Sequence, residues 1–236
     1  MNAKLLEHFI QYREKHGVEI VRIFLIQKIK YQFSIIGKRK ELTTFVKEIL
    51  GESSVQRMML VEARAARVYW NFYKEKIGSK VVWKGRVPHQ KDVANELLDI
   101  GYHYLSNHIR KICEEIDFPT ELGFFHKAQS KNSHPFIYDF MEWLRPVVVD
   151  KVLLVIITKK KKVVEDVDEK LIKFFVYHMK IKLDSYVYHK ELRYCVTFNY
   201  WIHLLLLDLM HSINTNKKYR PLFPSLRHES RCKKTA

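Results

Sequence analysis

The sequence of 236 residues has few of the residues that interrupt regular structure. Seven glycines and six prolines leave little punctuation for a fold of many strands and turns, whereas Leu, Lys, Glu and aromatic residues are plentiful. The sequence therefore predicts an all-α fold with a single multi-helix bundle over residues 1–221. A basic, mobile tail is expected over residues 222–236.

Cysteine pairs and long apolar runs are also missing. Cys113, Cys195 and Cys232 are widely separated and include no C-x-x-C pair, so we expect neither a zinc knuckle nor a disulfide. The N-terminus has no uninterrupted apolar core of the signal-peptide type, and the apolar runs at 152–157 and 204–207 are too short to span a bilayer. We therefore expect a cytoplasmic protein in a reducing setting, without a membrane partner.

The charge of the chain is strongly unbalanced. It contains 42 Lys and Arg against 26 Asp and Glu, a formal net charge of +16. Because a field of this sign attracts polyanions, nucleic acid is the expected partner. A generic basic surface and association with ribosomes are the alternatives. An anionic membrane is disfavoured, because no basic amphipathic segment has a clean apolar face.

Apolar residues at helical spacing predict most of the secondary structure. Helices are expected over residues 4–36, 42–50, 55–77, 94–116, 170–191 and 197–213, with a further helix around Asp139 that Pro146 ends or kinks. Gly17 is predicted to divide the first segment, and Gly51 to end the second as a left-handed C-cap. Ser54 and Asp92 are predicted N-caps.

Residues 122–150 bring together side chains suited to chemistry. His126 ends an apolar run, and Asp139 and Glu142 lie three residues apart on one face of the predicted helix. One imidazole together with carboxylate oxygens suits Mn²⁺ or Mg²⁺ better than a structural zinc. From these residues alone a second interpretation stays open, in which His126 is a core histidine and the two carboxylates form a solvated helix face.

Glu62 is a second unusual carboxylate. It shares a helical stripe with Ala66, Tyr69 and Tyr73, an otherwise aromatic face on which a carboxylate must pair or bind something. An ordinary helix glutamate beside Arg67 is the alternative interpretation.

Three sequence blocks carry a resemblance to a known family. They are LVEARAARVYW at 60–70, DVANELLDIGYHYL at 92–105, and DFPTELGFFH followed by PFIYDFMEWLRPVVVD within 117–150. In this order and spacing, from about residue 5 to residue 221, the chain resembles the C-terminal helical domain of the CRISPR spacer-acquisition integrase, the "Cas one" family. The resemblance implies a metal-dependent DNA endonuclease and integrase that cleaves phosphodiesters and transfers strands during spacer acquisition.

The resemblance also assigns roles to four side chains. It implies that Glu62, His126 and Glu142 bind one Mg²⁺ or Mn²⁺ and that Asp139 assists at the same site, so all four are candidate catalytic residues. Such an ion stabilises the pentavalent phosphate and lowers the pKa of the nucleophile.

The partners follow from the charge and the family. Arg67, Lys127 and Arg145 are the cations nearest in sequence to the candidate site, and they are expected to contact the DNA backbone. The family implies double-stranded and branched DNA as substrates, the small adaptation protein "Cas two" as a partner, and a homodimer.

Two departures from the family pattern keep other functions open. Ala63 stands where the family usually has a glycine, and the chain begins near the first helix of the helical domain, so we expect the family's N-terminal β-sandwich domain to be absent. A non-catalytic DNA-binding remnant of a truncated integrase is therefore one alternative. A casposase-like transposon integrase is another, although the residues after 221 leave no room for the extra C-terminal DNA-binding domain that those relatives usually carry.

Overall fold

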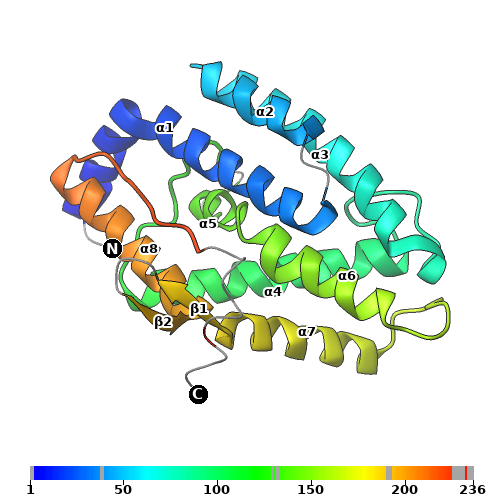
Figure 1. The fold of residues 1–236 in the computed structure, drawn as a ribbon. Helices are drawn as coiled ribbons and strands as arrows, with labels where there is room; N and C mark the ends of the chain where they lie inside the picture. Colours follow the sequence, from blue (N-terminus) through cyan, green and yellow to red (C-terminus); the bar gives the residue numbers. More distant parts are fainter. Residues whose placement is uncertain are drawn as a thin grey trace.

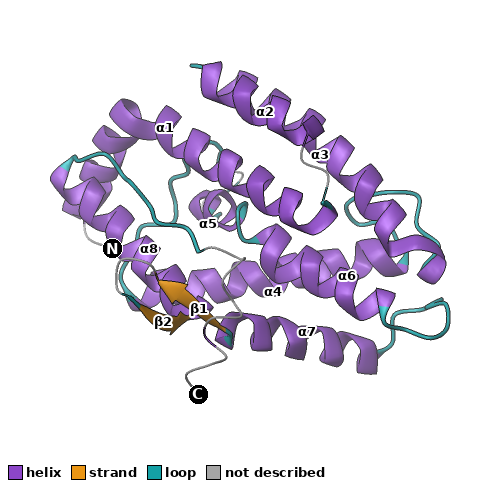
Figure 2. Ribbon diagram, viewed as in Figure 1, coloured by secondary structure: helices purple, strands orange, loops and turns teal. Residues whose placement is uncertain are grey.

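The structure is a computed structural model that describes residues 3–37, 40–128, 130, 133–189, 193–224 and 232. In chain order the elements are α1 (Ala3–Ile36), α2 (Lys40–Gly51), α3 (Val55–Ile77), the short 3-10 helix η1 (Gly78–Lys80), α4 (Val93–Glu115), α5 (Pro135–Met141), the π-helix η2 (Arg145–Asp150), α6 (Lys151–Thr158), α7 (Glu169–Asp184), β1 (Tyr186–His189), β2 (Tyr194–Thr197) and α8 (Phe198–Thr215). The predicted helical fold is confirmed, and one small hairpin is added to it (Figure 2). Within the described ranges, none of the helices combines the length and the apolar composition that crossing a membrane requires.

The short helix α5 lies at the centre of the bundle (Figure 1). Its side chains Phe136 and Phe140 are fully buried, and α1 and α4 both pack against it. The long helix α1 also contacts α2, α3, α8 and η2. As a result, α1, α3 and the segment from α5 to η2 meet in one region, and the predicted site residues come from these elements.

The predicted break at Gly17 is wrong, because α1 continues unbroken from Ala3 to Ile36. One glycine inside a helix costs only about 1 kcal/mol. On either side of Gly17, Tyr12, Ile20 and Phe24 are buried on the face that meets the core. Burial of such an apolar face on the order of 1.5–3 kcal/mol per large side chain outweighs the helix propensity of a single residue.

The predicted N-caps are confirmed, whereas the predicted glycine C-cap is wrong. The Ser54 side chain accepts a hydrogen bond from the Arg57 amide, and Asp92 accepts one from the Asn95 amide at 2.9 Å. Gly51 lies inside α2 without a positive φ. The glycine that follows a helix in the left-handed region is instead Gly37, at φ +72°, whose amide donates to the Phe33 carbonyl.

The C-terminal third differs most from the prediction. The helix expected over 170–191 ends at Asp184, and β1 then pairs antiparallel with β2 in the register Tyr186↔Thr197 (residues 190–192 lie outside the described ranges). Both strands are rich in Tyr and Val, which pack well on a pleated surface. The expectation of unpaired cysteines is also wrong, because Cys195 on β2 forms a disulfide with Cys232, while Cys113 is free and buried.

Packing continues past Pro221 into the region predicted to be a tail. The indole of Trp201 donates to the Leu222 carbonyl at 2.6 Å, and the Tyr31 hydroxyl donates to the Pro224 carbonyl at 2.7 Å. The Phe223 ring lies 4.9 Å from that of Trp143. Apart from Cys232, the rest of the predicted tail lies outside the described residues.

Gly101 allows close packing of α4 against its neighbours. A Cβ at this position would lie 2.5 Å from Cγ1 of Val149 in η2 and 3.0 Å from the Phe175 ring in α7. We expect Gly101→Ala to lower the free energy of unfolding by about 1–3 kcal/mol, as overpacking of a core does. Gly51→Ala is the matched control, because a Cβ there meets nothing within 4 Å and should raise stability by about 0.5–1 kcal/mol. Urea denaturation checks both, and equal effects in the two variants would contradict this packing.

Candidate functional site

A tight loop before α5 is built around the carboxylate of Asp139. This side chain is fully buried, and it accepts hydrogen bonds from the backbone amides of Phe124, Phe125 at 3.2 Å and His126 at 2.9 Å. Gly123 makes the turn possible, because a Cβ there would lie 2.4 Å from the His126 carbonyl oxygen and 2.9 Å from Asp139 Oδ2. Asp139 is therefore a buried support for the loop rather than an exposed group.

The same carboxylate orients the imidazole of His126. Nδ1 of His126 lies 2.6 Å from Oδ1 of Asp139, so this nitrogen carries the proton that is donated to the carboxylate. Burial raises the pKa of Asp139, and the hydrogen bonds and charge of His126 partly oppose that rise. With Nδ1 protonated, the Nε2 lone pair is available to a ligand, and the His126 side chain is 35% exposed.

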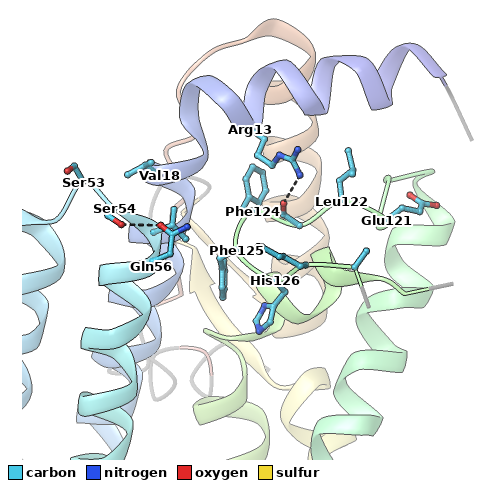
Figure 3. A pocket seen from close by; sticks show the side chains of 14 residues that line it. Arg13, Val18, Ser53, Ser54, Gln56, Glu121, Leu122, Phe124, Phe125 and His126 are labelled. Carbon is cyan, nitrogen blue, oxygen red and sulfur yellow. Dashed lines mark hydrogen bonds between the residues drawn. The ribbon is translucent and has the colours of Figure 1, made fainter. Parts of the chain in front are cut away.

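His126 lies between two surface hollows. The first, of about 570 Å³, is bordered by α1, the start of α3 and the loop (Figure 3). There Arg13 reaches from α1 to the Gly123 carbonyl at 3.4 Å, and His126 hangs from the opposite side of the loop. The second, of about 560 Å³, includes Arg110 and Tyr138. Lys127 borders both hollows.

Glu62 and Glu142 are brought together by a lysine from α1. Nζ of Lys28 lies 2.6 Å from Oε1 of Glu62 and 2.6 Å from Oε2 of Glu142. The three side chains are 11%, 19% and 6% exposed for Lys28, Glu62 and Glu142 respectively. Burial alone would lower the pKa of Lys28, but the charges of Glu142 and Glu62 outweigh it and raise the pKa, so the group is an ammonium ion.

Arg145 supplies a second positive charge to Glu142. Its Nη1 lies 2.8 Å from Glu142 Oε1, which leaves each carboxylate oxygen of Glu142 in contact with a cation. Burial would raise the pKa of Glu142, but the charges of Arg145 and Lys28 exceed that effect and lower it to about 2. Glu142 is therefore ionised at neutral pH. It follows α5 in a short turn before η2, whose second residue is Pro146, as the predicted interruption of this helix requires.

A buried tyrosine cluster supports Arg145 from behind. The hydroxyls of Tyr69 and Tyr102 donate to the carboxylate of Asp150 at 2.9 and 2.7 Å, and the Tyr73 hydroxyl donates to the Asp150 carbonyl at 2.7 Å. The guanidinium of Arg145 lies 4.9 Å from the centre of the Tyr102 ring. Burial raises the pKa of Asp150 to about 6, although the tyrosine hydrogen bonds oppose the rise.

The predicted site residues therefore form two groups. Glu62 and Glu142 share Lys28, and His126 pairs with Asp139. The groups are close enough that the charge of His126 contributes to lowering the pKa of Glu142. Even so, among the described residues no three His, Cys, Asp or Glu side chains lie close enough together to hold a metal ion.

The predicted DNA-contacting cations differ in their surroundings. Arg67 and Lys127 are exposed and free of resolved ion pairs, whereas Arg145 is partly buried and bound to Glu142. The donor set nevertheless fits a hard divalent cation, because two carboxylates and an imidazole nitrogen are ligands that Mg²⁺ and Mn²⁺ accept. The Lys28 ammonium already provides a positive charge between the two carboxylates.

Three important residues were missed from the sequence. Lys28 lies four residues after the buried Phe24 and four before the buried Gln32, so a lysine on the apolar face of α1 was the available signal. Gly123 and Asp150 were visible only as parts of longer motifs. Their roles depend on contacts with residues distant in sequence, which no local pattern contains.

Comparison with known sequences supports a family assignment. The sequence model of the family described as "CRISPR associated protein Cas1" matches residues 5–181. CRISPR-associated endonuclease Cas1 1 of Saccharolobus solfataricus is 27% identical over 156 residues, which cover 60% of this chain and 44% of that protein. CRISPR-associated endonuclease Cas1 1 of Archaeoglobus fulgidus is 24% identical over 196 residues, which cover 70% of this chain and 56% of that protein. The chain thus spans about half the length of the curated relatives it matches.

Solved structures show a similar fold. A CAS1 protein from Thermotoga maritima superposes with a TM-score of 0.77 at 20% identity, covering 92% of this chain and 70% of that one. A casposase bound to an integration product gives 0.79 at 17% identity, covering 92% and 67%. A chain of a Cas6-RT-Cas1–Cas2 complex gives 0.77 at 17% identity, covering 94% and 27%.

Proposed function

Because the chain belongs to the CRISPR-associated Cas1 family, we propose that it is a metal-dependent DNA endonuclease and integrase of spacer acquisition. The proposed metal ligands are Glu62, His126 and Glu142, and the proposed ion is Mg²⁺ or Mn²⁺. The reaction is phosphodiester cleavage and the transfer of a strand to a new 3′-hydroxyl. The names of the relatives from Saccharolobus solfataricus and Archaeoglobus fulgidus, both endonucleases, support this reaction class.

One observation carries the proposal most directly. Carboxylates from two separate elements, Glu62 on α3 and Glu142 after α5, contact a single cation at 2.6 Å each. Two buried carboxylates this close repel each other unless a positive charge lies between them. An arrangement of this kind, at the edge of an accessible imidazole, is suited to holding a divalent ion.

The remaining residues act by orienting these groups. Asp139 holds the Nδ1 proton of His126, and so directs the Nε2 lone pair away from the loop. Arg145 fixes Oε1 of Glu142. When bound, the ion would stabilise the negative charge that develops on the phosphate and lower the pKa of the attacking hydroxyl.

DNA binding is proposed to be mainly electrostatic. The net charge of +16 exceeds what the site itself needs, and Lys127 and Arg67 are exposed cations near it. Phosphate contacts of this type position a duplex or a branched DNA without reading its sequence. The fold similarity to a chain of a Cas6-RT-Cas1–Cas2 complex supports a further proposal, that a Cas2 protein is a partner.

A cleavage assay tests the proposed reaction. The purified chain is incubated with a labelled branched duplex and Mn²⁺, and nicked or strand-transferred products are expected. Chelation of the metal with EDTA should abolish them, because the ion supplies the stabilisation of the phosphate. Products that persist in EDTA would contradict the metal-dependent reaction.

A second candidate function is non-catalytic DNA binding. It is favoured by one observation: no three potential ligands within the described part of the chain are close enough to bind a metal. On this alternative the chain binds DNA, with affinity falling by about 10³-fold or more between about 50 and 200 mM salt, but yields no products with any metal. A casposase-like integrase shares the fold and would instead join DNA ends to a target, which the same assay detects as strand-transfer products.

A further inference from the structure

Lys28 occupies an unusual position for a lysine. It lies in the interior of α1, and its ammonium contacts one oxygen of Glu62 and one of Glu142 at 2.6 Å each. These two oxygens are therefore no further apart than twice that distance. Only 11% of the Lys28 side chain is exposed, so water contributes little to the solvation of its charge.

The charges around Lys28 balance without any further ion. Glu62 and Glu142 carry two negative charges, and Lys28 and Arg145 carry two positive charges in direct contact with them. Removal of one partner from a buried ion pair leaves an uncompensated charge, which is strongly unfavourable. Lys28 therefore keeps two carboxylates from different elements ionised and adjacent.

A divalent ion and the Lys28 ammonium need the same oxygens. Mg²⁺ binds carboxylate oxygens at about 2.0–2.1 Å and requires a nearly fixed geometry, so it cannot share Glu62 Oε1 and Glu142 Oε2 with an ammonium between them. Adding two positive charges beside Lys28 and Arg145 would also reverse the local balance. The flexible four-carbon stem of lysine allows its charged end to withdraw without a change in the helix.

We propose that Lys28 is a positioning residue that holds Glu62 and Glu142 together in the metal-free protein and is displaced from them when the divalent ion binds. The proposal rests on the metal site of the proposed function and names the internal cation with which the metal competes. Metal binding is then an exchange of one cation for another, and Lys28 sets the apparent metal affinity.

The test measures Mn²⁺ affinity by calorimetry on the full chain, together with thermal unfolding in EDTA. Lys28→Met should lower the melting temperature in EDTA, because the carboxylates lose their counter-ion. It should also bind Mn²⁺ at least about 10-fold more tightly than the parent, because the competing ammonium is gone. The rise in melting temperature on addition of Mn²⁺ should therefore be larger in Lys28→Met than in the parent.

Two further variants make the result decisive. Lys30→Met removes the same charge from the exposed side of α1, and it should leave both the Mn²⁺ affinity and the melting temperature nearly unchanged. Lys28→Gln keeps a hydrogen-bond donor for one carboxylate, so it provides a folded variant without the charge if Lys28→Met does not fold. It too should bind Mn²⁺ more tightly than the parent.

The outcomes separate this inference from the proposed function. If the parent binds Mn²⁺ through Glu142, as shown by loss of binding in Glu142→Gln, and the Lys28 variants bind it equally or less tightly, displacement of Lys28 is wrong while the metal site stands. If neither the parent nor the Lys28 variants bind Mn²⁺, both proposals are wrong. Tighter binding in the Lys28 variants alone supports the inference.

Discussion

Glu142→Gln is expected to reduce metal-dependent DNA cleavage by at least about 10³-fold. The substitution keeps the size of the side chain but removes the charge that faces both Lys28 and Arg145. Loss of the metal removes several kcal/mol of transition-state stabilisation, and about 4 kcal/mol corresponds to a factor of about 10³ in rate. Initial rates of nicking on a branched duplex with Mn²⁺ measure the effect.

A surface glutamate provides the control for this variant. Glu48 pairs with Arg64 on the exposed side of α2 and α3, so Glu48→Gln makes the same chemical change outside the site. It should cleave at the parent rate. DNA affinity and thermal stability are measured in parallel, because Glu142→Gln leaves two cations without a partner. A folded, DNA-binding Glu142→Gln that cleaves at the parent rate would show that this carboxylate has no part in the reaction.

Asp139→Asn should be among the most destabilising single substitutions in the chain. The two carboxylate oxygens accept four hydrogen bonds, three from backbone amides and one from the His126 ring. An asparagine offers one oxygen and turns an NH₂ group toward the other donors. With about 1–3 kcal/mol for each buried donor left unsatisfied, we expect a loss of about 2–4 kcal/mol in the free energy of unfolding.

Urea denaturation monitored by circular dichroism tests this expectation. Asp117→Asn is the matched control, because Asp117 is exposed just after α4 at φ +53°, a conformation that asparagine also accepts. Its unfolding should match that of the parent within about 0.5 kcal/mol. If Asp139→Asn were as stable as Asp117→Asn, the loop around His126 would not depend on the buried carboxylate.

The sequence was most informative where local chemistry and periodicity agree. The caps at Ser54 and Asp92 are recognisable because a short polar side chain precedes an apolar helical pattern, and both form. Glu62 stood out because a carboxylate on an aromatic helix face needs a partner, and the structure supplies Lys28. In each case the relevant partner or pattern lies within a turn or two of helix.

Long-range contacts explain what the sequence did not reveal. The hairpin of β1 and β2 and the disulfide from Cys195 to Cys232 both depend on pairing between segments, and the 37-residue separation of the two cysteines has no local signature. Gly17 carries a helix-breaking preference of only about 1 kcal/mol, which the buried face of α1 outweighs. The pairing of Glu62 with Glu142 through Lys28 joins three elements, so only the folded chain contains it.

The central claim is that Glu62, His126 and Glu142 together bind one divalent ion, and Mn²⁺ titration of His126→Ala tests it most directly. Calorimetry should show one Mn²⁺ bound per parent chain and an affinity at least about 10-fold weaker in His126→Ala, since the imidazole is the one nitrogen ligand. His211→Ala, which truncates an exposed histidine on α8, should bind as the parent does. Binding of Mn²⁺ by His126→Ala as tightly as by the parent would contradict the account.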